Sequence, residues 1–236
     1  MIAILRNLLS SKLNDPTFYL ALGLLTFWIL DTYLKIFVKH DPAQMLWWSS
    51  AGLGLSVLAL FLRNSFLINS LFCALFFHEL LWSSSYLSSL LFKTDSTYFA
   101  YYMFQPNYPK LNYFVGLFHL LLVPSLVFAI IKTKKIHKAG WIGATIFGFV
   151  ILFLSYLFSD QTSNLNCIRP EFDLKACKIY LNYLYHLYYL NYVNNLSGII
   201  LVNLVYMIIF FIPANLILIW AGKKYHWQIV SFDNNK

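Results

Sequence analysis

The chain has 236 residues, of which 60% are hydrophobic, 19% aromatic and only 11% charged. A soluble domain of this size carries about 25% charged residues, so the composition excludes a water-soluble globule. The net charge of +8 does not indicate a nucleic-acid partner, because the lysines lie in short loops beside apolar segments.

Six apolar segments come near or above the ~18 residues that a helix needs to cross a bilayer. Helices are expected because unpaired backbone amides are costly in lipid, and the alternation typical of barrel strands is absent. The sequence predicts one all-α integral membrane domain, 1–236, folded as a polytopic bundle of about six transmembrane helices. The expected spans are 17–38, 46–62, 65–92, 113–131, 141–159 and 197–221.

The distribution of charge predicts the orientation of these spans. On one side of a six-span topology lie ten basic residues and two acids, a net charge of +8. The other side carries six basic residues and five acids, a net charge of +1. Because cytoplasmic loops are enriched in Lys and Arg, both termini are predicted to be cytoplasmic.

Three further features of the sequence, two in connections and one in the last span, carry structural expectations. Only Arg63 and Asn64 separate the second and third spans, which predicts a tight antiparallel hairpin. The long outer segment 160–195 contains Cys167 and Cys177, which form a disulfide or remain free thiols, since spacing alone does not decide their geometry. Proline in the last span, at Pro213, is expected to kink that helix.

Few ionisable residues lie within the predicted spans, and such residues usually face the interior of a bundle. At about 1.5 Å per helical residue, they all fall in the outer half of the membrane. Two consecutive serines that open the second span, Ser49 and Ser50, lie at a similar depth. The ionisable residues are Asp31, Lys35, His78, Glu79 and His119.

The charged residues of this group also have structural interpretations. Asp31 and Lys35 are four residues apart and would neutralise each other on one helix face, or Lys35 would extend to the outer interface. His78 and Glu79 point about 100° apart, and Glu79 is expected to face the centre because a lipid-facing carboxyl costs more. His119 would either bond to a neighbouring carbonyl or act as a base.

The serines also have a packing interpretation, because small residues let transmembrane helices approach closely. Gly52 and Gly54 in the same span strengthen it. A zinc site would need three or four of the buried carboxylates and histidines, but no His-x-x-x-His or Glu-x-x-His pair is present. We therefore predict no metal site and no cofactor.

Five short motifs follow one another between the second span and the outer loop. They are Trp47-Trp48-Ser49-Ser50, Glu79-Leu80-Leu81-Trp82, Tyr102-Met103-Phe104, Phe118-His119 followed by Pro124, and Asn164-Leu165-Asn166. In this order they resemble a group of uncharacterised bacterial multi-pass membrane proteins over residues 46–167. That resemblance implies a location in the cell membrane, the inner membrane of a bacterium.

More distantly, the chain is similar to the YwaF-type membrane proteins, the related transmembrane acyltransferases and the androgen-induced hydrolases of fatty-acid esters of hydroxy fatty acids. This similarity implies a six-helix bundle with a Thr or Cys nucleophile on one helix and a histidine on another. The histidine maps onto His119, and the nucleophile falls near Ser49 or Ser50. The closer bacterial group has Cys-Asp where this chain has two serines, and often Gln where it has Glu79.

The chemistry that these residues indicate is acyl transfer from a membrane lipid. Ser49 or Ser50 would attack a lipid ester, His119 would act as base, and Glu79 or Asp31 would orient the imidazole. An amide donor for the oxyanion is expected from Asn164 or Asn166. The alternatives are a non-catalytic scaffold or assembly factor and a transporter of a small solute or ion.

Overall fold

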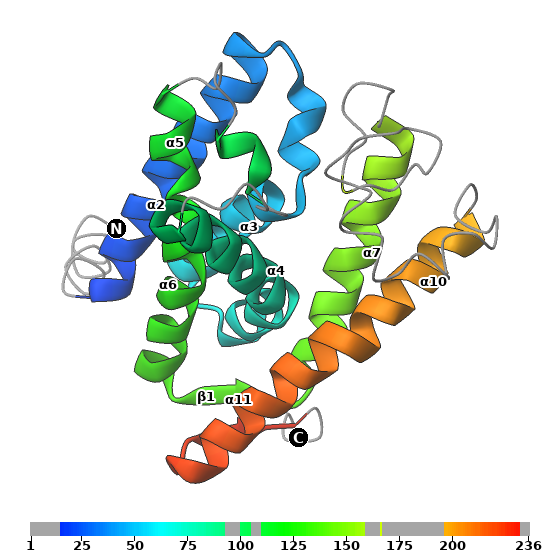
Figure 1. Ribbon diagram of the computed structural model, residues 1–236. Helices are drawn as coiled ribbons and strands as arrows, with labels where there is room; N and C mark the ends of the chain where they lie inside the picture. The colour runs from blue at the N-terminus through cyan, green and yellow to red at the C-terminus, as the bar shows by residue number, and fades with distance from the viewer. Residues whose placement is uncertain (1–14, 93–99, 105–109, 159–165, 167–195, 232–236) are drawn as a thin grey trace, which may run out of the picture.

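The computed structural model describes residues 15–92, 100–104, 110–158, 166 and 196–231, and these are almost entirely helical (Figure 1). The α-helices are α2 (Pro16–Tyr33), α3 (Trp48–Leu62), α4 (Ser65–Phe92), α5 (Lys110–Gly116), α6 (Phe118–Thr133), α7 (Gly140–Phe158), α10 (Leu196–Tyr206) and α11 (Ile212–Lys224). The π-helical turns are η1 (Leu34–Val38) and η5 (Met207–Phe211), and the 3-10 turns are η2 (Pro42–Leu46) and η3 (Tyr101–Phe104). Two short strands are β1 (Lys135–His137) and β2 (Gln228–Val230).

The predicted all-α polytopic bundle is confirmed, and the chain is an integral membrane protein. Five helical segments are long and apolar enough to cross a membrane: Pro16–Val38, Ser65–Phe92, Lys110–Thr133, Gly140–Phe158 and Gly198–Lys224. The remaining predicted span, 46–62, contains α3, which has only 15 residues. At 1.5 Å per residue α3 is about 22 Å long, shorter than the roughly 30 Å hydrocarbon layer.

Small residues set the position of α3 within the bundle. A Cβ atom built on Gly54 would lie 2.6 Å from Trp28 Nε1 on α2, and one on Gly52 would lie 2.5 Å from Leu75 Cδ2 on α4. The two glycines therefore let α2 and α4 approach different faces of α3, as the packing interpretation predicts. Between these two contact faces, α3 presents large exposed side chains, Leu58 and Leu62 among them.

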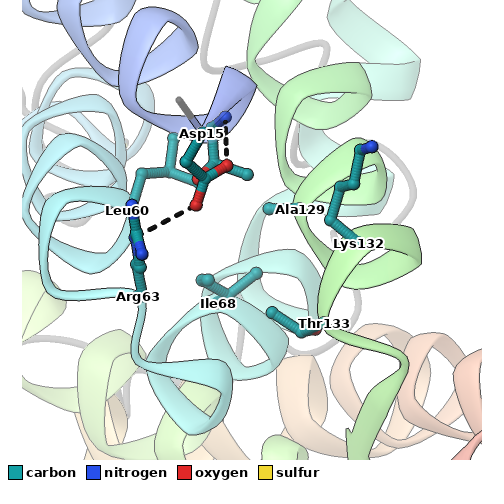
Figure 2. A pocket seen from close by; sticks show the side chains of 8 residues that line it. Asp15, Leu60, Arg63, Ile68, Ala129, Lys132 and Thr133 are labelled. Carbon is teal, nitrogen blue, oxygen red and sulfur yellow. Dashed lines mark hydrogen bonds and ion pairs between the residues drawn. The ribbon is translucent and has the colours of Figure 1, made fainter. Parts of the chain in front are cut away.

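One end of the bundle carries the basic residues that are predicted to be cytoplasmic, and we call it the basic end. It is held together by contacts between segments far apart in the sequence. At this end, Asp15 pairs with Arg63 across 3.0 Å (Figure 2). The strand β1 also lies here (Figure 1), and it pairs in parallel with β2, which follows α11. The side-chain amides of Asn69 and Asn215 bond to the backbone carbonyls of Lys135 and Lys138. The connection 132–140 thus contains a strand, because the segment after α11 supplies partners for its backbone.

The last span is distorted in front of Pro213, where the sequence predicts a kink. The turn η5 ends there, and the Ile212 amide donates to the carbonyl of Met207, five residues earlier. Proline supplies no amide hydrogen, so a regular helical ladder is interrupted at this point. The distortion is therefore a π-helical turn, which is a recognised way for a helix to bend.

Candidate functional site

Three polar side chains meet where α2, η1 and α3 adjoin, and we call them the lysine cluster: Asp31, Lys35 and Ser50. The Lys35 Nζ lies 2.7 Å from Asp31 Oδ2 and also donates to the Ser50 hydroxyl. All three residues are buried, with Ser50 only 2% exposed. The predicted pairing of Asp31 with Lys35 is confirmed, and Lys35 does not extend to the interface.

The local sequence explains why these groups meet. Asp31 and Lys35 are one helical turn apart, so they share a face of the helix. Ser50 precedes Gly54 by four residues and therefore lies on the face of α3 that packs against Trp28 of α2. The close packing of Gly54 against α2 therefore also directs Ser50 toward Lys35.

Two further residues form a second buried contact, which we call the histidine pair: Glu79 on α4 and His119 on α6. Glu79 Oε2 lies 2.7 Å from His119 Nδ1, and Glu79 is 1% exposed. The imidazole is stacked between the rings of Trp82 and Phe118, with centroids 3.9 and 4.1 Å away. A carboxylate that accepts from Nδ1 holds the ring in one orientation and keeps Nε2 available for chemistry.

Glu79 faces the interior, as the sequence analysis expects, whereas His78 is only half-buried. His78 stacks on the indole of Trp48 with centroids 4.8 Å apart. Within the described residues, Glu79 Oε1 has no hydrogen-bond partner. A buried carboxylate oxygen without a partner is costly, so this position has capacity for one more donor.

The structure does not bring the predicted serine and histidine together by a hydrogen bond. In the described part of the chain, Ser50 bonds to Lys35 and His119 bonds to Glu79. Ser49, next to Ser50 in sequence, is half-buried. Of the two roles expected for Asp31, the structure shows the pairing with Lys35, and Glu79 is the carboxylate that bonds to the imidazole. Sequence gives the depth of these residues but not the rotation of their helices, and the two polar groups face different neighbours.

Asn166 has a structural role that the sequence analysis did not anticipate. Its Oδ1 accepts from the Trp48 amide at the start of α3, and its Nδ2 donates to the Leu46 carbonyl and the Ser155 hydroxyl. Both amide hydrogens are therefore engaged, which leaves none for an oxyanion. The other predicted donor, Asn164, and the predicted disulfide of Cys167 and Cys177 lie outside the described residues.

A serine–histidine hydrogen bond does occur, but at the basic end of the bundle. The Oγ atom of Ser65 lies 2.9 Å from His137 Nε2, and the His137 amide donates to Asn69 Oδ1. Burial, together with the nearby charge of Lys135, lowers the pKa of His137 below its ordinary value. No carboxylate is bonded to this histidine among the described residues, so the contact fixes β1 against the start of α4.

Neither a metal site nor a match to a known protein assigns a function to these residues. In the described ranges, no three His, Cys, Asp or Glu side chains are grouped closely enough to hold a metal ion. No family model, no curated protein and no solved structure matches the chain. The fold and the site thus define a class, a multi-pass helical membrane protein with a buried Lys–Ser contact and a buried Glu–His contact.

Proposed function

We propose that the protein is an intramembrane acyl hydrolase or acyltransferase that acts on membrane lipids, with Ser50 as its nucleophile. The observation that supports this is the hydrogen bond between the Ser50 hydroxyl and Lys35, which Asp31 holds in place. Serine–lysine pairs are an established variant of the serine nucleophile with an adjacent base. The similarity to transmembrane acyltransferases and fatty-acid-ester hydrolases, which also places a nucleophile near this position, is part of the same proposal.

The reaction requires Lys35 as a neutral amine, in which Nζ can accept a proton. Ser50 Oγ attacks the carbonyl carbon of a lipid ester while its proton passes to Lys35 Nζ. The tetrahedral intermediate then breaks its bond to the alcohol oxygen, and Lys35 returns the proton to that leaving oxygen. An acyl group remains on Ser50.

The second half of the reaction releases the acyl group. Water attacks the acyl carbonyl as Lys35 accepts its proton. The tetrahedral intermediate then breaks its bond to Ser50 Oγ, Lys35 returns the proton to that oxygen, and a fatty acid is released. An alcohol in place of water gives acyl transfer to that alcohol. No external oxidant, reductant or metal enters either step.

His119 is the alternative base in this proposal, as the resemblance implies. Glu79 orients its imidazole, and this arrangement matches the acid–histidine half of a serine triad. Among the described residues, His119 makes no hydrogen bond to Ser49 or Ser50, whereas Lys35 Nζ bonds directly to the Ser50 hydroxyl. Lys35 is therefore the base that we favour.

A non-catalytic scaffold is the second candidate, and one observation supports it. Each buried polar contact joins two different helical elements: Lys35 connects η1 to α3, and Glu79 connects α4 to α6. Buried polar contacts of this kind also specify how transmembrane helices pack. A transporter has less support, since the sequence shows no repeated halves. For either function, we propose a bacterial inner-membrane location, which the resemblance implies, and cytoplasmic termini, which the distribution of basic residues supports.

A serine-reactive probe distinguishes the two candidates. The full chain, purified in detergent, would be incubated with a fluorophosphonate, which forms a stable phosphonyl adduct with an activated serine. We expect labelling of the wild type, loss in Ser50→Ala and Lys35→Met, and retention in Ser49→Ala, the matched neighbouring serine. His119→Ala assigns the base: labelling is retained if Lys35 is the base and lost if the imidazole is.

Folding of each variant would be checked by size-exclusion chromatography and thermal unfolding. Absence of labelling in the wild type, or labelling that survives Ser50→Ala in a folded sample, contradicts the catalytic proposal. The scaffold interpretation predicts no labelling of the wild type, together with a lower thermal stability of the Lys35 variant.

A further inference from the structure

The start of α3 is held by a residue that lies far away in the sequence. Trp47, which precedes the helix, has an extended backbone at φ −54° and ψ 136° and forms no side-chain cap. The side-chain amide of Asn166 bonds to the backbone on both sides of it, at 2.9 Å to the Trp48 amide and 2.8 Å to the Leu46 carbonyl. Because one asparagine amide both accepts and donates here, it fixes the point at which α3 begins.

Asn166 is in turn fixed by α7 and suits its own backbone conformation. Its Nδ2 donates to Ser155 Oγ across 2.7 Å, and Ser155 is fully buried on α7. The φ angle of Asn166 is 53°, in the left-handed region that asparagine adopts more readily than most residues. The side chain of Asn166 therefore connects the first turn of α3 to the neighbouring helix α7.

The side chain of Trp48 determines the directions in which the next residues of α3 point. Its indole Nε1 donates to the Ala74 carbonyl on α4 across 3.1 Å, and only 5% of Trp48 is exposed. Each helical residue turns the chain by about 100°, so Ser50, two residues later, points about 200° away from Trp48. With Trp48 held against α4, Ser50 is directed away from α4 and toward Lys35, to which it bonds.

The neighbouring serine, Ser49, would take the place of Ser50 if α3 turned by one residue, about 100°. Both side chains carry the same hydroxyl group, so the rotation of the helix decides which of them meets Lys35. On the basis of the proposed function, we propose that Asn166 is a positioning residue. Its hydrogen bonds fix the rotation of α3 and thereby select Ser50, and not Ser49, as the nucleophile.

The sites of fluorophosphonate attachment in folded variants test this role. Asn166→Gly removes the side chain without backbone strain, because glycine readily adopts a positive φ. Ser155→Ala is milder, since it removes one of the three hydrogen bonds of the Asn166 side chain. Asn215→Ala is the matched control, because it also removes an amide that bonds to a backbone carbonyl, but at the basic end of the bundle. Peptide mass spectrometry of the full chain, labelled in detergent, measures the rate of modification at Ser50 and the share of adduct on Ser49.

We expect the wild type and Asn215→Ala to carry the adduct on Ser50. In Asn166→Gly the rate at Ser50 should fall at least about tenfold, because a displacement of ~1 Å costs up to about 10²-fold, and the share of adduct on Ser49 should rise. Ser155→Ala should change both quantities in the same direction and by less. A lower overall stability does not alter the share of Ser49 in a folded sample, so this share separates positioning from stability.

Two failures are distinguishable. A wild type without any adduct refutes the proposed function, and the positioning role of Asn166 falls with it. A wild-type adduct on Ser50, with the same rate and the same share of Ser49 in folded Asn166→Gly, keeps the nucleophile and overturns the positioning role. An equal loss of rate in Asn215→Ala overturns it as well. Thermal unfolding establishes that each variant is folded, and if Asn166→Gly does not fold, Ser155→Ala decides by the same criteria.

Discussion

Replacement of Lys35 by methionine removes the positive charge from the lysine cluster and keeps the length of the side chain. The change leaves the Asp31 carboxylate buried without its partner 2.7 Å away, and it removes the donor to the Ser50 hydroxyl. Removal of one partner of a buried ion pair costs about 3–5 kcal/mol, because the other charge remains uncompensated. At roughly 2–4 °C per kcal/mol for a chain of this size, the melting temperature should fall by about 6–20 °C.

The double variant Asp31→Leu/Lys35→Met is the decisive comparison. When both charges are replaced by apolar side chains, no buried charge is left unpaired, and the change in stability should be within about 1–2 kcal/mol of zero. Thermal unfolding in detergent, followed by tryptophan fluorescence, measures both variants. Lys39→Met, on the adjacent and exposed turn, is the control and should shift the melting temperature little. A double variant as unstable as Lys35→Met would refute the ion-pair argument.

Three other predictions concern a closely packed glycine, a capping asparagine and the histidine of β1. Gly54→Ala should destabilise the bundle by about 1–3 kcal/mol, because the new Cβ would meet Trp28 Nε1 at 2.6 Å, whereas Gly23→Ala, with nothing within 4 Å, should be neutral in the same thermal assay. Asn166→Ala should cost about 0.5–2 kcal/mol through loss of the bond to the Trp48 amide, and a stability equal to wild type would contradict the capping role. His137 has a lowered pKa in the folded state, so its contribution to stability is present above about pH 6.5 and is lost as the pH falls toward the folded value. His137→Gln should remove that part of the pH dependence, and an unchanged pH profile would contradict it.

The spans were predictable from sequence because the membrane imposes helix length and apolar composition directly. The third span, 65–92, coincides with α4, and the first, 17–38, coincides with α2 and η1 within one residue. The tight hairpin between α3 and α4 is also present, with Arg63 in the left-handed conformation at φ 52°. The predicted span 46–62 begins two residues before α3, because Leu46 and Trp47, which precede the helix, are also apolar.

The site was harder to predict because the depth of a residue in the membrane and the rotation of its helix have different physical origins. Topology fixes how far each residue lies from the membrane surface, and it groups Ser50 with His119. Rotation depends on close contacts between particular helices, and the approach of Trp28 to Gly54 turns Ser50 toward α2 and Lys35. The pairs Asp31–Lys35 and Glu79–His119 follow from simpler rules, the spacing of four and the cost of a lipid-facing carboxyl.

The most direct test of the central claim is the position of the covalent adduct after reaction with a fluorophosphonate. Peptide mass spectrometry of the labelled full chain can distinguish the two adjacent serines of α3 by their fragment ions. The proposal that Ser50 is activated by Lys35 predicts a phosphonyl adduct on Ser50 and its loss in Lys35→Met. An adduct on Ser49, on Ser65 or on no serine would contradict it.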